Sequence, residues 1–193
     1  MWFLVPTIII LVAGVWFLSK SSAGPMEEGS DLSLVPVNTP VEGTVEFSIP
    51  SRTHIAHGTS AADWISNPPT GGQHWDRPAD NGNYDQAPAD EEIVHSMEHG
   101  YVWISYRPAD AVPRSSTSSA GLKPGLSEDE INRLKEIVKS DDWKIILSPR
   151  DKNDSVIALA SWGRLLKMEE PDYDKIKDFI KTYRNRGPEK TPN

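Results

Sequence analysis

Residues 101–106 read Tyr-Val-Trp-Ile-Ser-Tyr, a run of mostly aromatic and β-branched residues without glycine, proline or a charged side chain. Such runs are typical of β-strands, so we predict a strand here. Two further apolar runs, at residues 143–147 and 155–161, predict two more strands, and the polar turn at residues 151–154 suggests that they form a hairpin. Upstream, residues 45–49 alternate between apolar and polar side chains and predict a fourth strand, which ends at Pro50.

Two helices are predicted in the second half of the chain. Ser127 and Glu130 have the spacing of a capping box, and apolar residues follow them at helical intervals. The second helix begins near Asp172 and ends before Gly187, and we expect Arg164 and the charged tail beyond residue 183 to be solvated helix ends. The order of these elements favours a small α+β sandwich with an antiparallel or mixed sheet, two helices on one face and a long irregular loop at residues 51–90.

The N-terminus carries the signature of a membrane segment. Residues 1–19 have no charged side chain, and a helix of about 19 residues spans roughly 28 Å, close to the hydrocarbon thickness of a bilayer. We therefore predict an N-terminal transmembrane helix that acts as a signal-anchor. The alternative is a cleaved signal peptide, with the small residues 21–23 as its cleavage site.

The rest of the chain is divided by composition. Residues 20–40 are rich in Ser, Gly, Pro and acidic side chains and predict a linker. Residues 41–190 are then one α+β domain on the periplasmic or extracellular side of the membrane. The expectation is a single-pass membrane protein whose partners are the membrane and a membrane complex.

Charge and cysteine content exclude several functions. The 193-residue chain carries a net charge of −8 and contains no cysteine. An acidic chain without clusters of Lys or Arg lacks the positive charge that neutralises phosphates, which argues against a nucleic-acid partner. The lack of cysteine excludes disulfides, zinc–thiolate sites, iron–sulfur clusters and thiol catalysis.

All five histidines lie between residues 54 and 99, and two of them belong to the segment His-Ser-Met-Glu-His at residues 95–99. If this segment is helical, His95 and His99 share a face. If it is extended, His95, Met97 and His99 share a face. Either geometry brings two imidazoles together. Upstream, the Pro-Pro and Gly-Gly pairs at residues 68–69 and 71–72 predict a loop that points His74 in one direction.

We interpret these histidines as a metal site in a protein of unknown physiological role. Three histidines alone suit zinc and copper equally well. The nearby thioether and the lack of a thiolate favour copper outside the cytoplasm, so copper is favoured over zinc. Glu98 is expected to orient one imidazole by a hydrogen bond. The predicted ligands are His54, His74, His95 and His99, with Met97 beside them.

Two other functions fit the same residues. The first is a non-catalytic accessory or interaction subunit of a membrane complex, with structural histidines. The second is a zinc-dependent hydrolase, because His-x-x-Glu-His is also the inverzincin pattern, in which the glutamate activates a zinc-bound water. That pattern needs a sustained helix and a third ligand farther on, whereas Gly100 and a strand follow at once. The sequence therefore favours a protein without enzymatic activity, and we assign no catalytic residue.

Several motifs are specific when taken together. They are His-Ile at 54–55, Asn-Pro-Pro-Thr-Gly-Gly-Gln-His at 67–74, Gly82 with Tyr84, Val-His-Ser-Met-Glu-His-Gly-Tyr-Val at 94–102, Ala-Ser-Trp-Gly-Arg at 160–164 and Tyr-Arg-Asn-Arg-Gly-Pro-Glu at 183–189. With these motifs the chain resembles a bacterial and archaeal family known as domain of unknown function 3105, over residues 44–189.

The resemblance implies an N-terminal anchor or signal and an extracytoplasmic domain, with no established activity. It also implies that four of the five histidines match the family pattern, while His57 is peculiar to this chain. Members of the family usually read Ser-Gly-Pro-His where this chain has Gly-Gly-Gln-His at residues 71–74, and leucine where it has Met97.

Overall fold

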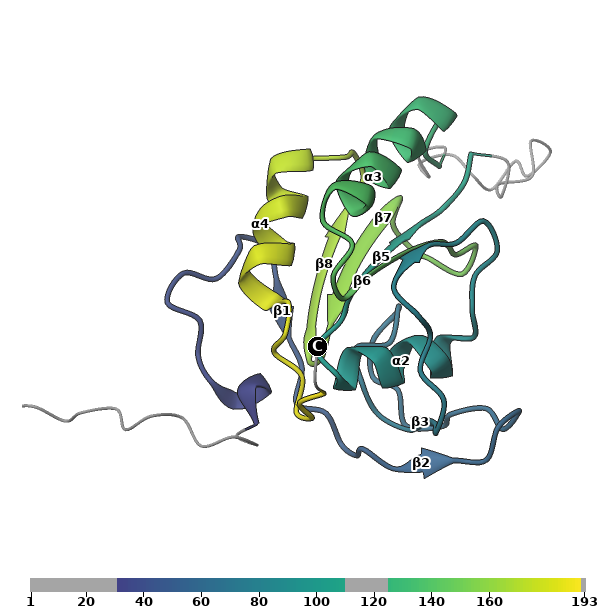
Figure 1. Ribbon diagram of the computed structural model, residues 1–193, viewed down its shortest axis with the longest axis vertical. Coiled ribbons are helices and arrows are strands. Elements are labelled where there is room, and N and C mark those ends of the chain that lie inside the picture. Colours follow the sequence, from purple (N-terminus) through teal and green to yellow (C-terminus); the bar gives the residue numbers. More distant parts are fainter. Residues whose placement is uncertain (1–30, 110–124, 192–193) are drawn as a thin grey trace, which may run out of the picture. The chain divides into compact units, whose positions relative to one another are not determined.

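The computed structural model describes residues 31–109 and 125–191, and the chain from Asp31 onward forms one compact unit (Figure 1). The strands are β1 (Val45–Glu46), β2 (His54–Ile55), β3 (His74–Trp75), β4 (Gly82–Asn83), β5 (Val102–Tyr106), β6 (Ile145–Pro149), β7 (Ile157–Ser161) and β8 (Arg164–Met168). The helices are the 3-10 helix η1 (Leu32–Leu34) and the α-helices α2 (Asp90–Glu98), α3 (Glu128–Ser140) and α4 (Tyr173–Tyr183).

Six strands form one mixed sheet in the order β1-β8-β7-β5-β6-β4, and β2 and β3 form a separate parallel pair. β5 lies in the middle of the larger sheet, with β6 parallel on one side and β7 antiparallel on the other. The strand predicted at residues 101–106 is therefore confirmed. Because parallel neighbours need a long crossover, the chain passes through α3 between β5 and β6.

The predicted hairpin between the strands at 143–147 and 155–161 is wrong. β6 and β7 do run in opposite directions, but both pair with β5 and lie on opposite sides of it. A turn signal shows where a chain reverses and not which strand lies alongside. β7 forms its hairpin with β8, a strand that we did not predict, through the turn at Trp162 and Gly163. Arg164 opens that strand and is 6% exposed, so it is no solvated helix end.

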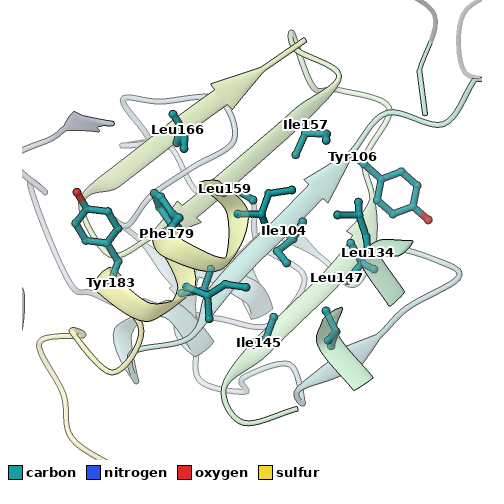
Figure 2. Close-up of a cluster of buried hydrophobic side chains, with 14 of the residues drawn as sticks. Ile104, Tyr106, Leu134, Ile145, Leu147, Ile157, Leu159, Leu166, Phe179 and Tyr183 are labelled. Carbon is teal, nitrogen blue, oxygen red and sulfur yellow. The ribbon is translucent and has the colours of Figure 1, made fainter. Parts of the chain in front are cut away.

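Both faces of the sheet are covered, because successive side chains of a strand point to opposite sides. On one face, α3 and α4 pack their apolar side chains on alternate residues of β5 to β8 (Figure 2). On the other face, α2 and the irregular segment before it pack on the intervening strand residues. The second cluster includes Met97 of α2, Trp103 of β5 and Ile146 of β6.

The predicted fold class needs correction. The described residues form a small α+β domain with a mixed sheet, but three α-helices cover its two faces, whereas we expected two helices on one face. The predicted transmembrane helix at residues 1–19 lies outside the described residues. Within the described ranges no helix has the length and apolar character needed to cross a bilayer. The expectation of a single-pass membrane protein is therefore not upheld.

Candidate metal site

The parallel pair of β2 and β3 brings the first two histidines together. His54 and His74 are direct partners in the register of the two strands, although 19 residues separate them in the sequence. Their imidazole rings meet edge to face, with 4.7 Å between the ring centroids. His54 is half exposed, with 49% of its side chain accessible, whereas His74 is completely buried.

The loop before β3 holds His74 in place. Gly71 and Gly72 have φ angles of +151° and +115°, which side-chain-bearing residues rarely adopt. A Cβ on Gly72 would lie 2.6 Å from the Asp63 carboxylate, which instead accepts a hydrogen bond of 2.7 Å from the Gln73 backbone N–H. The expected role of the glycine pair in directing His74 agrees with this geometry.

The helix α2 supplies the third imidazole and a carboxylate. Its N-cap is Ala89 and its C-cap is His99, so the segment 95–99 follows the helical alternative that we considered. His95 and Glu98, three residues apart, share the face of α2 that lies near β2 and β3. Ser96 fixes the helix to the preceding segment with a hydrogen bond of 2.7 Å to the Ala79 carbonyl.

Three imidazoles from three elements converge here. His54, His74 and His95 each offer a ring nitrogen, and these nitrogen atoms all lie within 4.8 Å of one another. The His95 ring is 4.9 Å from the His54 ring and 5.0 Å from the His74 ring, measured between centroids. In a tetrahedral zinc site, ligand nitrogens about 2.1 Å from the ion lie ~3.4 Å apart, so a modest inward movement of these side chains would complete such a site.

Hydrogen bonds fix which nitrogen is available. The Nδ1 atom of His74 lies 2.7 Å from the Gly72 carbonyl oxygen, and the Nδ1 atom of His95 lies 2.6 Å from the Trp75 carbonyl oxygen. Because a carbonyl only accepts, each Nδ1 carries the proton, and each neutral ring keeps its lone pair on Nε2. Metal-binding histidines are typically oriented by such a bond from the ring nitrogen that does not bind the ion.

The buried carboxylate of Glu98 is the fourth group of the cluster. Its Oε2 atom lies 3.0 Å from His74 Nε2 and 3.7 Å from His54 Nε2. Among the described residues, His74 Nε2 nevertheless has no hydrogen-bond partner of good angle, so the short distance to Glu98 is a close contact and not a directed hydrogen bond. A buried carboxylate beside an imidazole lone pair is repulsive unless a cation, either a proton or a metal ion, lies between them.

The pKa shifts follow from this geometry. Burial lowers the pKa of His74, but the contact with Glu98 and the bond to the Gly72 carbonyl outweigh it and raise the pKa overall. Burial raises the pKa of Glu98, but His74, His54 and His95 outweigh it and lower the pKa overall. For His95, burial and the neighbouring histidines lower the pKa, which keeps its ring neutral and able to bind a metal ion at neutral pH.

Two predicted ligands lie differently. The His99 ring is 4.6 Å from the His95 ring, but its Nε2 atom lies 3.5 Å from the Glu189 carboxylate, and His99 is outside the three-histidine group. Met97 is fully buried in the hydrophobic cluster under α2. The sequence did not suggest Glu189 as a partner of His99, since nothing in its local pattern shows that the C-terminal segment returns to α2.

The comparisons agree with the motifs. A family described as "Protein of unknown function (DUF3105)" matches residues 54–118 and 121–193, so the chain belongs to this family and the resemblance is confirmed. No curated protein and no solved structure matches the chain. All three converging histidines lie within the matched residues. The family's description names no function.

Proposed function

We propose that this domain binds one divalent transition-metal ion, zinc or copper, through His54, His74 and His95. The observation that carries the proposal is the convergence of three imidazole nitrogens, within 4.8 Å of one another, from three separate elements. Three imidazoles and a nearby carboxylate form a donor set of nitrogen and oxygen atoms that suits both ions. The thioether argument that favoured copper has no support in this geometry, because Met97 packs in the core.

Glu98 supports the proposal through its charge. Its side chain is only 5% exposed and lies against two of the three imidazoles. A buried negative charge is unfavourable without a compensating cation, and a divalent ion held by the three imidazoles would provide it. Glu98 would then stabilise the ion either as a further oxygen ligand or as a close countercharge.

The test is elemental analysis of the whole chain, purified without a histidine tag, equilibrated with zinc or copper and then desalted. We expect about one ion per chain in the wild type. His54→Ala and His95→Ala are expected to lose it. His54→Ala is the sharper variant, because the half-exposed His54 side chain can be removed with little damage to the core.

The matched control is His57→Ala. His57 is exposed, lies in the same region and packs its ring at a tilt against Trp75, with 4.2 Å between ring centroids, but it is not part of the converging group. We expect His57→Ala to retain the ion, and His99→Ala to retain it as well. A wild type that holds no ion, or a His57→Ala loss equal to that of His54→Ala, would refute the proposed site.

A further inference from the structure

A cavity of about 790 Å³ lies between the N-terminal segment, residues 31–49, and the β7–β8 turn. Its volume falls within the range of roughly 300–1,000 Å³ that is typical of small-molecule sites. Leu34, Phe47 and Trp162 contribute apolar and aromatic walls. None of the three proposed metal ligands lines this cavity, so an inference about it does not depend on the proposed function.

A buried arginine lines the cavity. The Arg164 side chain is 7% exposed, and its Nη1 and Nη2 atoms donate to the Trp162 and Ser33 carbonyl oxygens at 3.3 and 2.9 Å. Neither carbonyl carries a net charge. The carboxylate of Glu46 lies 3.4 Å from Arg164 Nε, but the Glu46 side chain is 64% exposed, and among the described residues Nε has no hydrogen-bond partner of good geometry. The guanidinium thus has a buried donor left over and only a loosely placed countercharge.

A second unused polar group lines the same cavity. The Thr44 hydroxyl oxygen is buried and has no hydrogen-bond partner within the described part of the chain. Buried polar atoms without partners are uncommon in folded proteins, and each one calls for an explanation. Two of them in the lining of one cavity, one on a guanidinium and one on a hydroxyl, indicate a ligand that accepts hydrogen bonds and carries a negative charge.

We propose that this cavity binds a small monocarboxylate with an apolar body, its carboxylate held by Arg164 and Thr44 and its body against Phe47 and Trp162. An arginine fork matches the geometry of a carboxylate, and the apolar walls match the rest of such a molecule. Two arginines, Arg52 and Arg164, and two carboxylates, Asp31 and Glu46, line the cavity, so their formal charges cancel and a singly charged ligand is favoured over a doubly charged phosphate.

The first experiment compares two ligands of the same shape on the wild type. Isothermal titration calorimetry of the metal-free full chain is carried out with 3-phenylpropionate and with the neutral 3-phenylpropanol. The carboxylate is expected to bind at least about tenfold more tightly than the alcohol, since only the carboxylate pairs with the guanidinium. Equal affinities, or no binding of the carboxylate, would overturn the proposal.

Variants then locate the site. Arg164→Met and Thr44→Val are expected to weaken 3-phenylpropionate binding, the first by about tenfold or more. Because Arg164 also holds the Ser33 carbonyl, its replacement could loosen the wall, so Thr44→Val, which keeps the side-chain shape, is the second test. Lys167→Met is the control, on the same strand but exposed and paired with Asp154.

The two variants also separate this cavity from the candidate metal site. If the carboxylate bound among the histidines instead, His95→Ala would abolish binding while Arg164→Met and Thr44→Val left it intact, and the cavity proposal would fail. A chain that binds no metal ion but discriminates the carboxylate from the alcohol would support the cavity and refute only the metal site.

Discussion

The three imidazoles of the candidate metal site are held with different firmness. His74 and His95 are buried, and each is fixed by a hydrogen bond from Nδ1 to a backbone carbonyl. His54 is half exposed. A ligand that is already fixed loses little conformational freedom on binding, so His74 and His95 define the position of the ion, and His54 closes on it.

Glu98 gives the first prediction. Glu98→Gln keeps the shape of the side chain but removes the negative charge next to His74 and His54. We expect metal affinity to fall by about 10- to 100-fold, as is usual when a group that supports the ligands is changed. Competition titration against a metal-binding indicator measures it. Glu92→Gln, on the same helix but outside the cluster, is the control, and an equal fall in both variants would contradict the role of Glu98.

The sequence predicted the side chains of the candidate site better than the backbone atoms that hold them in place. The histidine segment and Glu98 could be recognised because their spacing is local. The Gly72 and Trp75 carbonyls could not, because a backbone acceptor leaves no mark in a sequence. The position of Met97 depended on whether its segment is a strand or a helix. In an extended segment Met97 would lie on the same face as His95, but in a helix residues two apart point in different directions, and Met97 faces the core.

The C-terminal segment packs closely against the end of α2. Gly187 lies against the end of α2, where a Cβ would collide with the Glu98 carbonyl oxygen and the Gly100 backbone nitrogen. Gly187→Ala is therefore expected to lower the free energy of unfolding by about 2–4 kcal/mol, measured by urea denaturation. Gly58→Ala is the control, since Gly58 has φ of +84° but open space around it, and should cost only about 1 kcal/mol. Similar losses of stability in the two variants would contradict this prediction, because they would show that a small shift of the backbone relieves the contact between the new Cβ and the end of α2.

The N-terminus of α3 gives a pH-dependent prediction. Ser127 donates to the Glu130 carboxylate from its backbone N–H, at 2.9 Å, and from its hydroxyl, at 2.6 Å, and these bonds lower the pKa of Glu130 below 4.5. The stabilisation is therefore present above pH 4.5 and is lost as the pH falls through the folded-state pKa. Glu130→Gln should lower the free energy of unfolding by about 0.5 kcal/mol at pH 7 and by less in acid.

Denaturation of Glu130→Gln at several pH values measures this difference. The control is Glu136→Gln, which removes an exposed carboxylate farther along the same helix, 3.8 Å from Lys139. Because such surface pairs contribute little, we expect its effect to be close to zero at every pH. A difference for Glu130→Gln that does not shrink in acid would contradict the capping argument.

How well each element could be predicted depends on the range of the interactions that form it. β5, α3 and α4 follow from local patterns, and the structure has them where the sequence placed them. β8 was missed because Arg164 and Lys167 interrupt its apolar character, although β8 gains its stability by pairing with β7. β2 and β3 have two residues each, too few for any period, and exist because two distant segments pair in register.

In the fold, the candidate metal site connects the irregular segment between β1 and α2 to the core around the central sheet. α2 packs on the central sheet, whereas β2 and β3 form only a two-stranded pair in the irregular segment between β1 and α2. An ion held by His54, His74 and His95 would link β2, β3 and α2, and so fix this segment to the core. A ligand that binds only the folded state raises its stability by mass action.

The last prediction follows from that linkage. At about 100 times its dissociation constant, an ion adds about 2.7 kcal/mol to the free energy of unfolding, which for a chain of this size corresponds to a rise in Tm of roughly 5–10 °C. Calorimetry with zinc or copper measures the rise, and His95→Ala should show none. Hydrogen exchange should slow most around β2 and β3, since the central sheet is already buried. A Tm that rises equally in His95→Ala would mean that the ion stabilises the fold from another place.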